Sequence, residues 1–197
     1  THLSAYHLTL EPNTLFHRHP PPLPDGELAA DMQDMIEARL AAGGYVNYET
    51  SAFAQPGREC RHNLNYWRFG DYLGIGAGAH SKLSFPDRIL RQMRYKQPPE
   101  YLQKAPAGAP VQEQHALLPK DRGFEFMMNA LRLAAGFEVA LFAERAGLPI
   151  SAVDQPLQEA ERRGLIARDH VRIAPTQHGQ RFLNDLLQLF LPPGGTA

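Results

Sequence analysis

Cysteine is scarce in this sequence. The 197 residues include one cysteine, Cys60, and one tryptophan, Trp67. A single cysteine excludes an internal disulfide framework and is typical of proteins kept in a reducing compartment. We therefore expect a cytoplasmic protein.

Excess charge and long apolar runs are lacking as well. The formal net charge is −1, which provides no general attraction to nucleic acid or to an anionic membrane surface. No apolar run approaches the roughly 18 residues of a membrane span, so we expect no transmembrane segment. The chain starts at Thr1 without a signal peptide, and a strand-like run follows at once. We expect it to be a piece of a longer protein.

The first half of the sequence carries an α/β pattern. The run "HLSAYHLTL" (2–10) predicts a strand, and the prolines after it exclude a helix in 15–24. Apolar residues at helical spacing between Asp25 and Gly43 predict a capped helix, and 45–54 predicts a second strand. Strand, helix and strand in this order indicate a unit of a parallel α/β sheet.

The middle of the chain is less regular. The run "DYLGIGAG" (71–78) predicts a third short strand. The segment 83–119 is rich in proline and has few periodic apolar positions, which predicts a connection that runs over the surface. We place a domain that covers 1–104 and a linker at 105–119.

The last part of the sequence changes character and predicts a mainly helical module over 120–191. One helix shows an apolar stripe of Phe124, Met127, Met128 and Leu131. The further elements that we expect are helices at 138–147 and 151–164, a hairpin at 166–176, a closing helix at 178–191 and a disordered tail at 192–197. Three helices, a hairpin and a closing helix indicate a winged-helix-like fold.

The glycine-rich stretch "GIGAGA" (74–79) matches the dinucleotide-binding fingerprint. That fingerprint needs a helix directly after it, whose N-terminus meets the pyrophosphate. Pro86 breaks any helix at this point, so the sequence does not favour a nicotinamide cofactor. We expect instead that these glycines let the backbone approach a ligand or a packed strand closely.

Several other polar residues are weaker candidates. His17 and His19 could share a metal on an extended chain, but no third ligand is evident. Ser51 and Ser81 lack the G-x-S-x-G context of a nucleophile. Glu49 follows a strand-like run, at the end where α/β proteins bind ligands, or else it is a solvated edge residue.

The stretch "CRHNLNYW" (60–67) holds the densest chemistry. Cys60 and His62 are both able to ligate iron. Tyr66 and Trp67 offer flat apolar faces that can stack on a macrocycle, each with a polar handle. The alternative is a loop in which Trp67 packs inward while His62 and Asn63 bind the backbone. The residues alone leave both interpretations open.

A winged-helix module also raises the question of DNA binding. Such modules place a helix in the major groove and contact phosphates through Lys and Arg. The helix expected to do so, 151–163, carries Arg162 and Arg163 against three acidic residues, Asp154, Glu159 and Glu161. It lacks a basic stripe, so we expect no nucleic-acid partner.

Four segments together resemble one family: "HLSAYHLTLEPNT", "YETSAFAQPG", "HNLNYWRFGDYLGIGAGAHS" and "GLIARDHVRIAPTQHGQRFLNDLL". The chain resembles, over residues 1–191, the radical-SAM enzymes related to oxygen-independent coproporphyrinogen III oxidase, and within them the haem-chaperone branch. The resemblance implies an α/β fold, with the C-terminal part of a partial TIM-like barrel followed by the winged-helix-like domain. Its H-N-x-x-Y-W motif falls on His62, Asn63, Tyr66 and Trp67, and implies haem binding there.

The resemblance also implies cofactors that this sequence alone does not provide. Members carry a C-x-x-x-C-x-x-C motif for a [4Fe–4S] cluster and a segment for S-adenosylmethionine, and neither motif occurs here. We therefore assign both cofactors to a full-length protein, with Gly74, Ile75, Gly76 and Ala77 bordering its S-adenosylmethionine pocket. We expect the chain itself to be inactive as a radical-SAM enzyme.

Three functions follow as hypotheses. The first is a haem chaperone with His62 as the iron ligand, Cys60 as the alternative ligand and a haem-accepting protein as partner. The second is an oxygen-independent coproporphyrinogen III oxidase of haem biosynthesis. The third is a winged-helix regulator that binds DNA.

Overall fold

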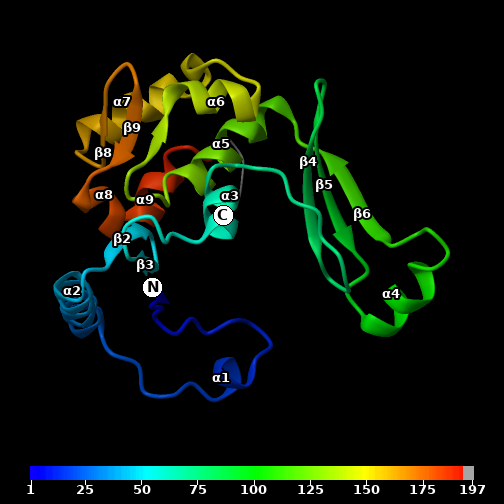
Figure 1. Ribbon diagram of the computed structural model, residues 1–197, viewed down its shortest axis with the longest axis horizontal. Coiled ribbons are helices and arrows are strands. Elements are labelled where there is room, and N and C mark those ends of the chain that lie inside the picture. Colours follow the sequence, from blue (N-terminus) through cyan, green and yellow to red (C-terminus); the bar gives the residue numbers. More distant parts are fainter. Residues whose placement is uncertain (193–197) are drawn as a thin grey trace. The chain divides into compact units, whose positions relative to one another are not determined.

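The computed structural model describes residues 1–192, which form two compact units (Figure 1). The first unit is Thr1–Cys60, and the second begins at Arg61. No helix in the described part of the chain is both long enough and apolar enough to cross a membrane.

The first unit contains a three-stranded sheet. Its strands are β1 (His2–Ser4), β2 (Val46–Glu49) and β3 (Ala52–Ala54), in the order β1-β3-β2. Both neighbouring pairs are antiparallel. The predicted succession of strand, helix and strand is present, but the predicted parallel pairing is wrong, because β3 lies between β1 and β2. The run 45–54 is a hairpin rather than one strand. Asn47 stabilises its turn, because the amide donates to the carbonyl oxygens of Glu49 and Ala52 at 2.9 and 3.4 Å.

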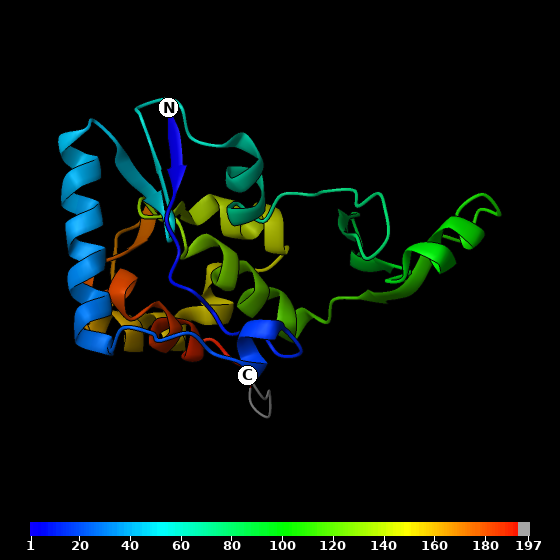
Figure 2. The same ribbon diagram turned by 90° about the horizontal axis from the view of Figure 1, so that it is seen from below.

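Two helices separate β1 from this hairpin. The helix α2 (Gly26–Ala42) begins after Asp25, whose carboxylate accepts from the backbone N–H of Leu28, and ends at Gly43, as predicted. Figure 2 shows its length. The single turn α1 (Leu15–Arg18) contradicts the exclusion of a helix in 15–24. Thr14 caps this turn, and the prolines within 15–24 begin only at Pro20, after the turn has ended.

The second unit opens with a short helix and a second antiparallel sheet. The helix is α3 (Arg61–Trp67), and the strands are β4 (His80–Ser84), β5 (Ile89–Arg94) and β6 (Val111–Ala116), in that order. A helix, α4 (Pro98–Lys104), lies in the β5–β6 connection, at the far end of the sheet in Figure 1. The surface connection predicted for 83–119 is therefore wrong. Polar side chains are frequent on both faces of these strands, so no apolar alternation marks them in the sequence.

The predicted strand at 71–78 is wrong as well. This segment forms a loop that touches β4 through a single bridge between Tyr72 and Lys82. The apolar residues of this segment are typical of a strand, but the glycines between them weaken strand pairing.

The rest of the second unit is mainly helical. Its elements are α5 (Pro119–Ala130), β7 (Phe137–Glu138), α6 (Val139–Ala146), the 3₁₀ turn η1 (Ile150–Val153), α7 (Asp154–Arg162), β8 (Ile166–Arg168), β9 (Arg172–Pro175), α8 (Gln177–Arg181) and α9 (Leu183–Gln188). The three predicted helices and the hairpin are confirmed. The short strand β7 was not predicted, and it completes a sheet of order β7-β9-β8. The closing helix is broken at Phe182. The tail predicted at 192–197 lies, except for Pro192, outside the described residues.

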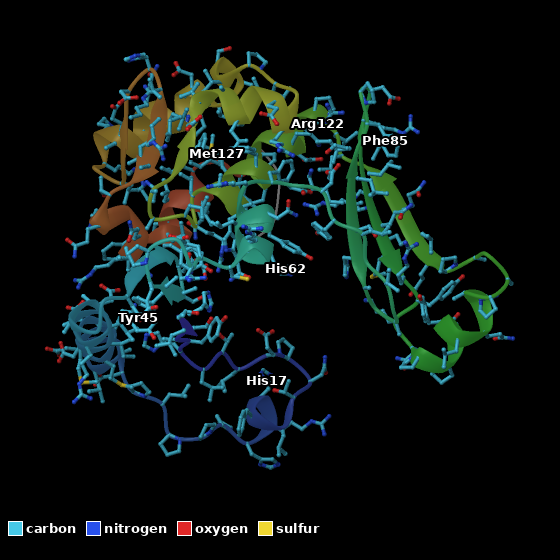
Figure 3. The ribbon with its side chains drawn as sticks, viewed as in Figure 1. His17, Tyr45, His62, Phe85, Arg122 and Met127 are labelled. Carbon is cyan, nitrogen blue, oxygen red and sulfur yellow. The ribbon has the colours of Figure 1, made fainter. Side chains whose placement is uncertain are left out.

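The core of the second unit centres on Phe126. Its ring meets those of Phe137 and Phe142 edge-on at 5.0 Å, and that of Phe69 at 5.8 Å. Met127 of the same helix is also buried (Figure 3). The predicted stripe is partly wrong, because Met128 is exposed. Phe126 takes its place in the core, so α5 presents a face rotated from the one that spacing alone indicates.

Candidate functional site

The helix α3 carries four of the residues singled out from the sequence. His62 and Tyr66 are four positions apart, as are Asn63 and Trp67, so each pair lies on one side of the helix. The segment is helical rather than the loop of the alternative interpretation. An extended course, which would point Cys60 and His62 the same way, does not occur because the helix begins at Arg61.

His62 presents its imidazole to solvent on this helix (Figure 3). The ring contacts that of Tyr66, with centroids 4.7 Å apart and planes at 59°. Within residues 1–192, neither ring nitrogen makes a hydrogen bond. An exposed imidazole whose nitrogens are not engaged can ligate a metal without first breaking a bond to the protein.

Trp67 lies on the neighbouring side of α3 and is half-buried. The guanidinium of Arg132 stands over its ring, 4.4 Å from the centroid. Such a cation–π contact ties the end of α3 to the segment that follows α5. The indole N–H is buried and has no hydrogen-bond partner in the described part of the chain. A buried donor of this kind lowers the stability of the fold unless a hydrogen-bond acceptor pairs with it.

Cys60 directly precedes α3 and ends the first unit. Its thiol is half-buried and forms no disulfide. As a free thiol it retains the ligating chemistry that the sequence suggests.

Tyr66 connects His62 to residues far away in the sequence. Its ring stacks on that of Tyr72, with centroids 4.3 Å apart and planes at 28°. The Tyr72 hydroxyl accepts a hydrogen bond from Arg91 at 2.8 Å, and Arg91 forms an ion pair with Glu125. Burial raises the pKa of Tyr72, and the nearby Arg91, which lowers it, does not outweigh burial. The phenol therefore stays protonated at neutral pH.

A second polar cluster is formed by Asp71, Lys82 and Ser84, which follow α3 in the chain. Lys82 is fully buried, with its ammonium 4.2 Å from the centroid of the Phe69 ring. It donates to the Asp71 carboxylate at 2.9 Å and to the Ser84 hydroxyl at 3.0 Å. Burial lowers the pKa of Lys82 and outweighs the bond to Asp71, which raises it. This cluster fixes the loop that leaves α3.

The glycine-rich segment follows in that loop. The Gly74 N–H donates to the hydroxyl of Ser81 at 3.0 Å, and a Cβ on Gly74 would overlap the backbone carbonyl of His80. The Gly76 N–H donates to the Tyr101 hydroxyl at 3.2 Å. The close approach that we expected is thus made to the chain's own strand β4. Ile75 between them is 81% exposed, and Ala77 is also exposed.

The weaker candidates lie elsewhere. Glu49 is 2% exposed, so it is not a solvated edge residue; Ser51 donates to its carboxylate at 3.3 Å. His17 and His19 are exposed on and just after α1. Among residues 1–192, no group of three or more His, Cys, Asp or Glu side chains could hold a metal ion.

The sequence did not indicate the residues that support α3. Tyr72 stands in an irregular loop, and Arg91 and Glu125 are 34 positions apart. Only the fold brings them together, because neither helical nor strand periodicity links positions so far apart. Phe69 could have been suspected as a core residue, but not as the partner of a buried lysine.

Comparison with known proteins finds one matching family model and several relatives. Residues 117–182 match the model of the HemN C-terminal domain. The heme chaperone HemW of Escherichia coli K12 is 46% identical over 96% of this chain and 50% of its own length. The heme chaperone HemW of Haemophilus influenzae is 44% identical over 96% of the chain and 49% of its own length, and that of Bacillus subtilis is 30% identical over 96% and 51%.

A solved structure shares the fold. Coproporphyrinogen III oxidase (HemN) from E. coli, described as a radical SAM enzyme, matches with a TM-score of 0.69 at 18% identity, over 96% of this chain and 47% of that one. The chain therefore spans about half the length of the relatives that it matches. These findings confirm the resemblance that the sequence motifs indicated.

Proposed function

Because the chain is related over almost its whole length to heme chaperones of the HemW type, we propose that it is the haem-binding part of such a chaperone. In this proposal α3 holds haem as cargo, His62 ligates the iron, and an acceptor protein receives the haem. Cys60 is the alternative ligand. Asn63, Tyr66 and Trp67 complete the haem site.

One observation carries the proposal. The motif residues lie on a single short helix, and the imidazole among them is exposed, with neither ring nitrogen in a hydrogen bond within the described residues. A neutral imidazole nitrogen is a common axial ligand of haem iron.

The chain does not by itself fit a [4Fe–4S] cluster. It has one cysteine, whereas the family motif takes three from the protein, and residues 1–192 offer no alternative cluster of ligands. We therefore assign the cluster and S-adenosylmethionine to a full-length protein, with residues 74–77 at the border of the S-adenosylmethionine pocket. The exposure of Ile75 and Ala77 supports a border position.

We propose the finer architecture on the same basis. Residues 1–104 are the C-terminal portion of a radical-SAM barrel with the strands that follow, 120–191 are a winged-helix-like domain, and 105–119 connect the two and include the strand β6. The succession of α5, β7, α6, α7, β8 and β9 supports the last assignment, as does the family match at 117–182.

The other two hypotheses are less well supported. The two relatives that are 46% and 44% identical to the chain are named as chaperones rather than oxidases. Arg162 of α7 and Arg163, which caps the helix, both pair with Glu159 of α7, which leaves little positive charge for DNA.

A haem titration of the 197-residue chain tests the proposal. The wild type and the variants His62→Ala, Cys60→Ser and His80→Ala are compared by the Soret band. We expect His62→Ala to weaken haem binding at least about tenfold, since the loss of an axial ligand costs more than about 1.4 kcal/mol. Cys60→Ser and His80→Ala should keep the wild-type spectrum. Retention of that spectrum and affinity by His62→Ala would contradict the assignment.

A further inference from the structure

Resting on the proposed function, we infer that Tyr72, held by Arg91 and Glu125, positions the His62 imidazole for iron. No ring of this set touches iron except that of His62. Tyr66 and Tyr72 act through it, and Arg91 and Glu125 act through Tyr72. They are therefore positioning residues.

The contacts form a continuous series from α3 to α5. The His62 ring lies 4.7 Å from that of Tyr66, and the Tyr66 ring lies 4.3 Å from that of Tyr72. Contacts at these distances are typical of interacting aromatic pairs. Tyr66 thus contacts a ring on either side of it in the series, which suits it to transmit the orientation of Tyr72 to His62.

Tyr72, the last ring of this series, is held in place by hydrogen bonds. Its hydroxyl accepts from the Arg91 Nη1 at 2.8 Å, and the same guanidinium donates through Nε to the Glu125 carboxylate at 3.0 Å and through Nη2 to the same oxygen. Arg91 and Glu125 are both about one-fifth exposed. A planar guanidinium held on two sides has little freedom, so the phenol on it is fixed to β5 and α5.

The physical benefit is preorganisation. An exposed imidazole on a short helix would sample several rotamers, and ligation of iron would require it to give up that freedom. Contact with a fixed ring removes part of the freedom before haem arrives. The orientation of the imidazole plane also affects the electronic properties of the bound iron, because groups that contact a ligand tune the metal that it binds.

The first test compares variants of the whole chain. Tyr72→Leu removes the stacked ring, whereas Tyr72→Phe keeps the ring and removes the bond to Arg91. We expect Tyr72→Leu to raise the haem dissociation rate about 2- to 10-fold, the equivalent of one side chain that is no longer held, and to broaden the ferric EPR signal. Tyr72→Phe should lie between it and the wild type. Tyr95→Leu is the matched control, a half-buried tyrosine of the same unit outside the series, and should leave rate and signal unchanged.

A second test separates positioning from a general effect on the fold. In His62→Gly, added imidazole supplies an iron ligand that does not depend on Tyr66. If Tyr72 acts through His62, Tyr72→Leu will have no effect in the imidazole-rescued His62→Gly background. An equal loss in both backgrounds, or an unchanged rate and EPR signal for Tyr72→Leu alone, would overturn the inference.

The failure of the proposed function is distinguishable from the failure of this inference. If His62→Ala binds haem as the wild type does, His62 is not the ligand, and both the proposed ligand and the positioning role of Tyr72 are wrong. If His62→Ala loses haem while Tyr72→Leu keeps wild-type rate and signal, only the positioning role falls.

Discussion

Lys82 is a fully buried lysine that lies next to an aromatic ring. Burying its charge costs free energy unless partners surround the ammonium. Lys82 has three donors, and Asp71, Ser84 and the face of Phe69 surround its ammonium. Removing one partner of a buried pair costs more than replacing the charge by an apolar side chain of similar volume. Phe69 itself has φ of 54°, a backbone conformation that persists only because packing holds the ring.

We predict that Asp71→Asn destabilises the protein more than Lys82→Met does. The first change leaves a buried ammonium with weaker acceptors and should cost about 2 kcal/mol, while the second removes the charge and should cost less. Urea unfolding of both variants beside the wild type measures the difference. A larger loss for Lys82→Met would show that the ion pair itself stabilises the fold.

The same pair predicts a pH dependence. Burial acts to raise the pKa of Asp71, but the hydrogen bonds from Lys82 and Ser84 outweigh it and lower the pKa below the ordinary 3.8. A lowered folded-state pKa adds stability that is fully present above 3.8 and is lost as the pH falls through the folded value. The stability gap between wild type and Asp71→Asn should therefore be constant at neutral pH and shrink below about pH 4. A gap that stays constant to pH 2.5 would refute this.

At the scale of elements, sequence and structure agree where caps and periodicity act together. The helix α2 was predicted from Asp25 to Gly43, and both ends are confirmed. The helices and hairpin of the C-terminal module were predicted for the same reason. The strands β5 and β6 were missed because their register joins residues 17 to 26 positions apart. The support of α3 was missed because its partners come from β5 and α5.

The absence of a side chain at Gly179 lets α8 pack closely against the C-terminal hairpin. Thr176 caps α8 by accepting from the Gly179 N–H at 3.0 Å. A Cβ on Gly179 would overlap the backbone carbonyl of Leu165, which precedes β8. Backbone cannot move aside as a flexible side chain does, so substitution must separate two packed segments.

We predict that Gly179→Ala lowers the free energy of unfolding by about 2 to 4 kcal/mol. Gly26→Ala is the matched control, since nothing lies within 4 Å of a Cβ there and the position is helical. That control should be neutral or raise stability by about 0.5 to 1 kcal/mol, because alanine is the better helix former. Thermal melts of the two variants decide the matter, and equal melting temperatures would contradict the packing argument.

The helix α7 yields a second prediction at this scale. Arg162 and Arg163 pair with Glu159, and Arg168 pairs with Asp154 and Glu161. Exposed pairs of this kind contribute little to stability, but they neutralise the charge that a DNA contact requires. We expect no micromolar binding to duplex DNA at physiological salt. Fluorescence anisotropy over a salt series measures it, and tight binding with a steep salt slope would reverse the assignment.

At the scale of the whole molecule, the chain covers about half the length of its relatives, and the proposed function divides the chemistry accordingly. The candidate haem ligand lies within the 197 residues, whereas these residues include one cysteine and lack the three-cysteine motif of a radical-SAM cluster. Binding of haem needs only a ligand and a surface to hold the macrocycle. Reductive cleavage of S-adenosylmethionine needs a one-electron donor beside the sulfonium, which the cluster supplies.

We therefore predict that the 197-residue chain binds haem and does not cleave S-adenosylmethionine. The chain is incubated with iron and sulfide under anaerobic conditions, given a reductant and S-adenosylmethionine, and assayed for 5′-deoxyadenosine. Product should stay at the background of a protein-free control, because one thiolate cannot hold a cluster that takes three from its protein. Cys60→Ser serves as the second control and should match the wild type. Product above background that disappears in Cys60→Ser would show that Cys60 alone anchors a working cluster and would overturn the division of chemistry argued here.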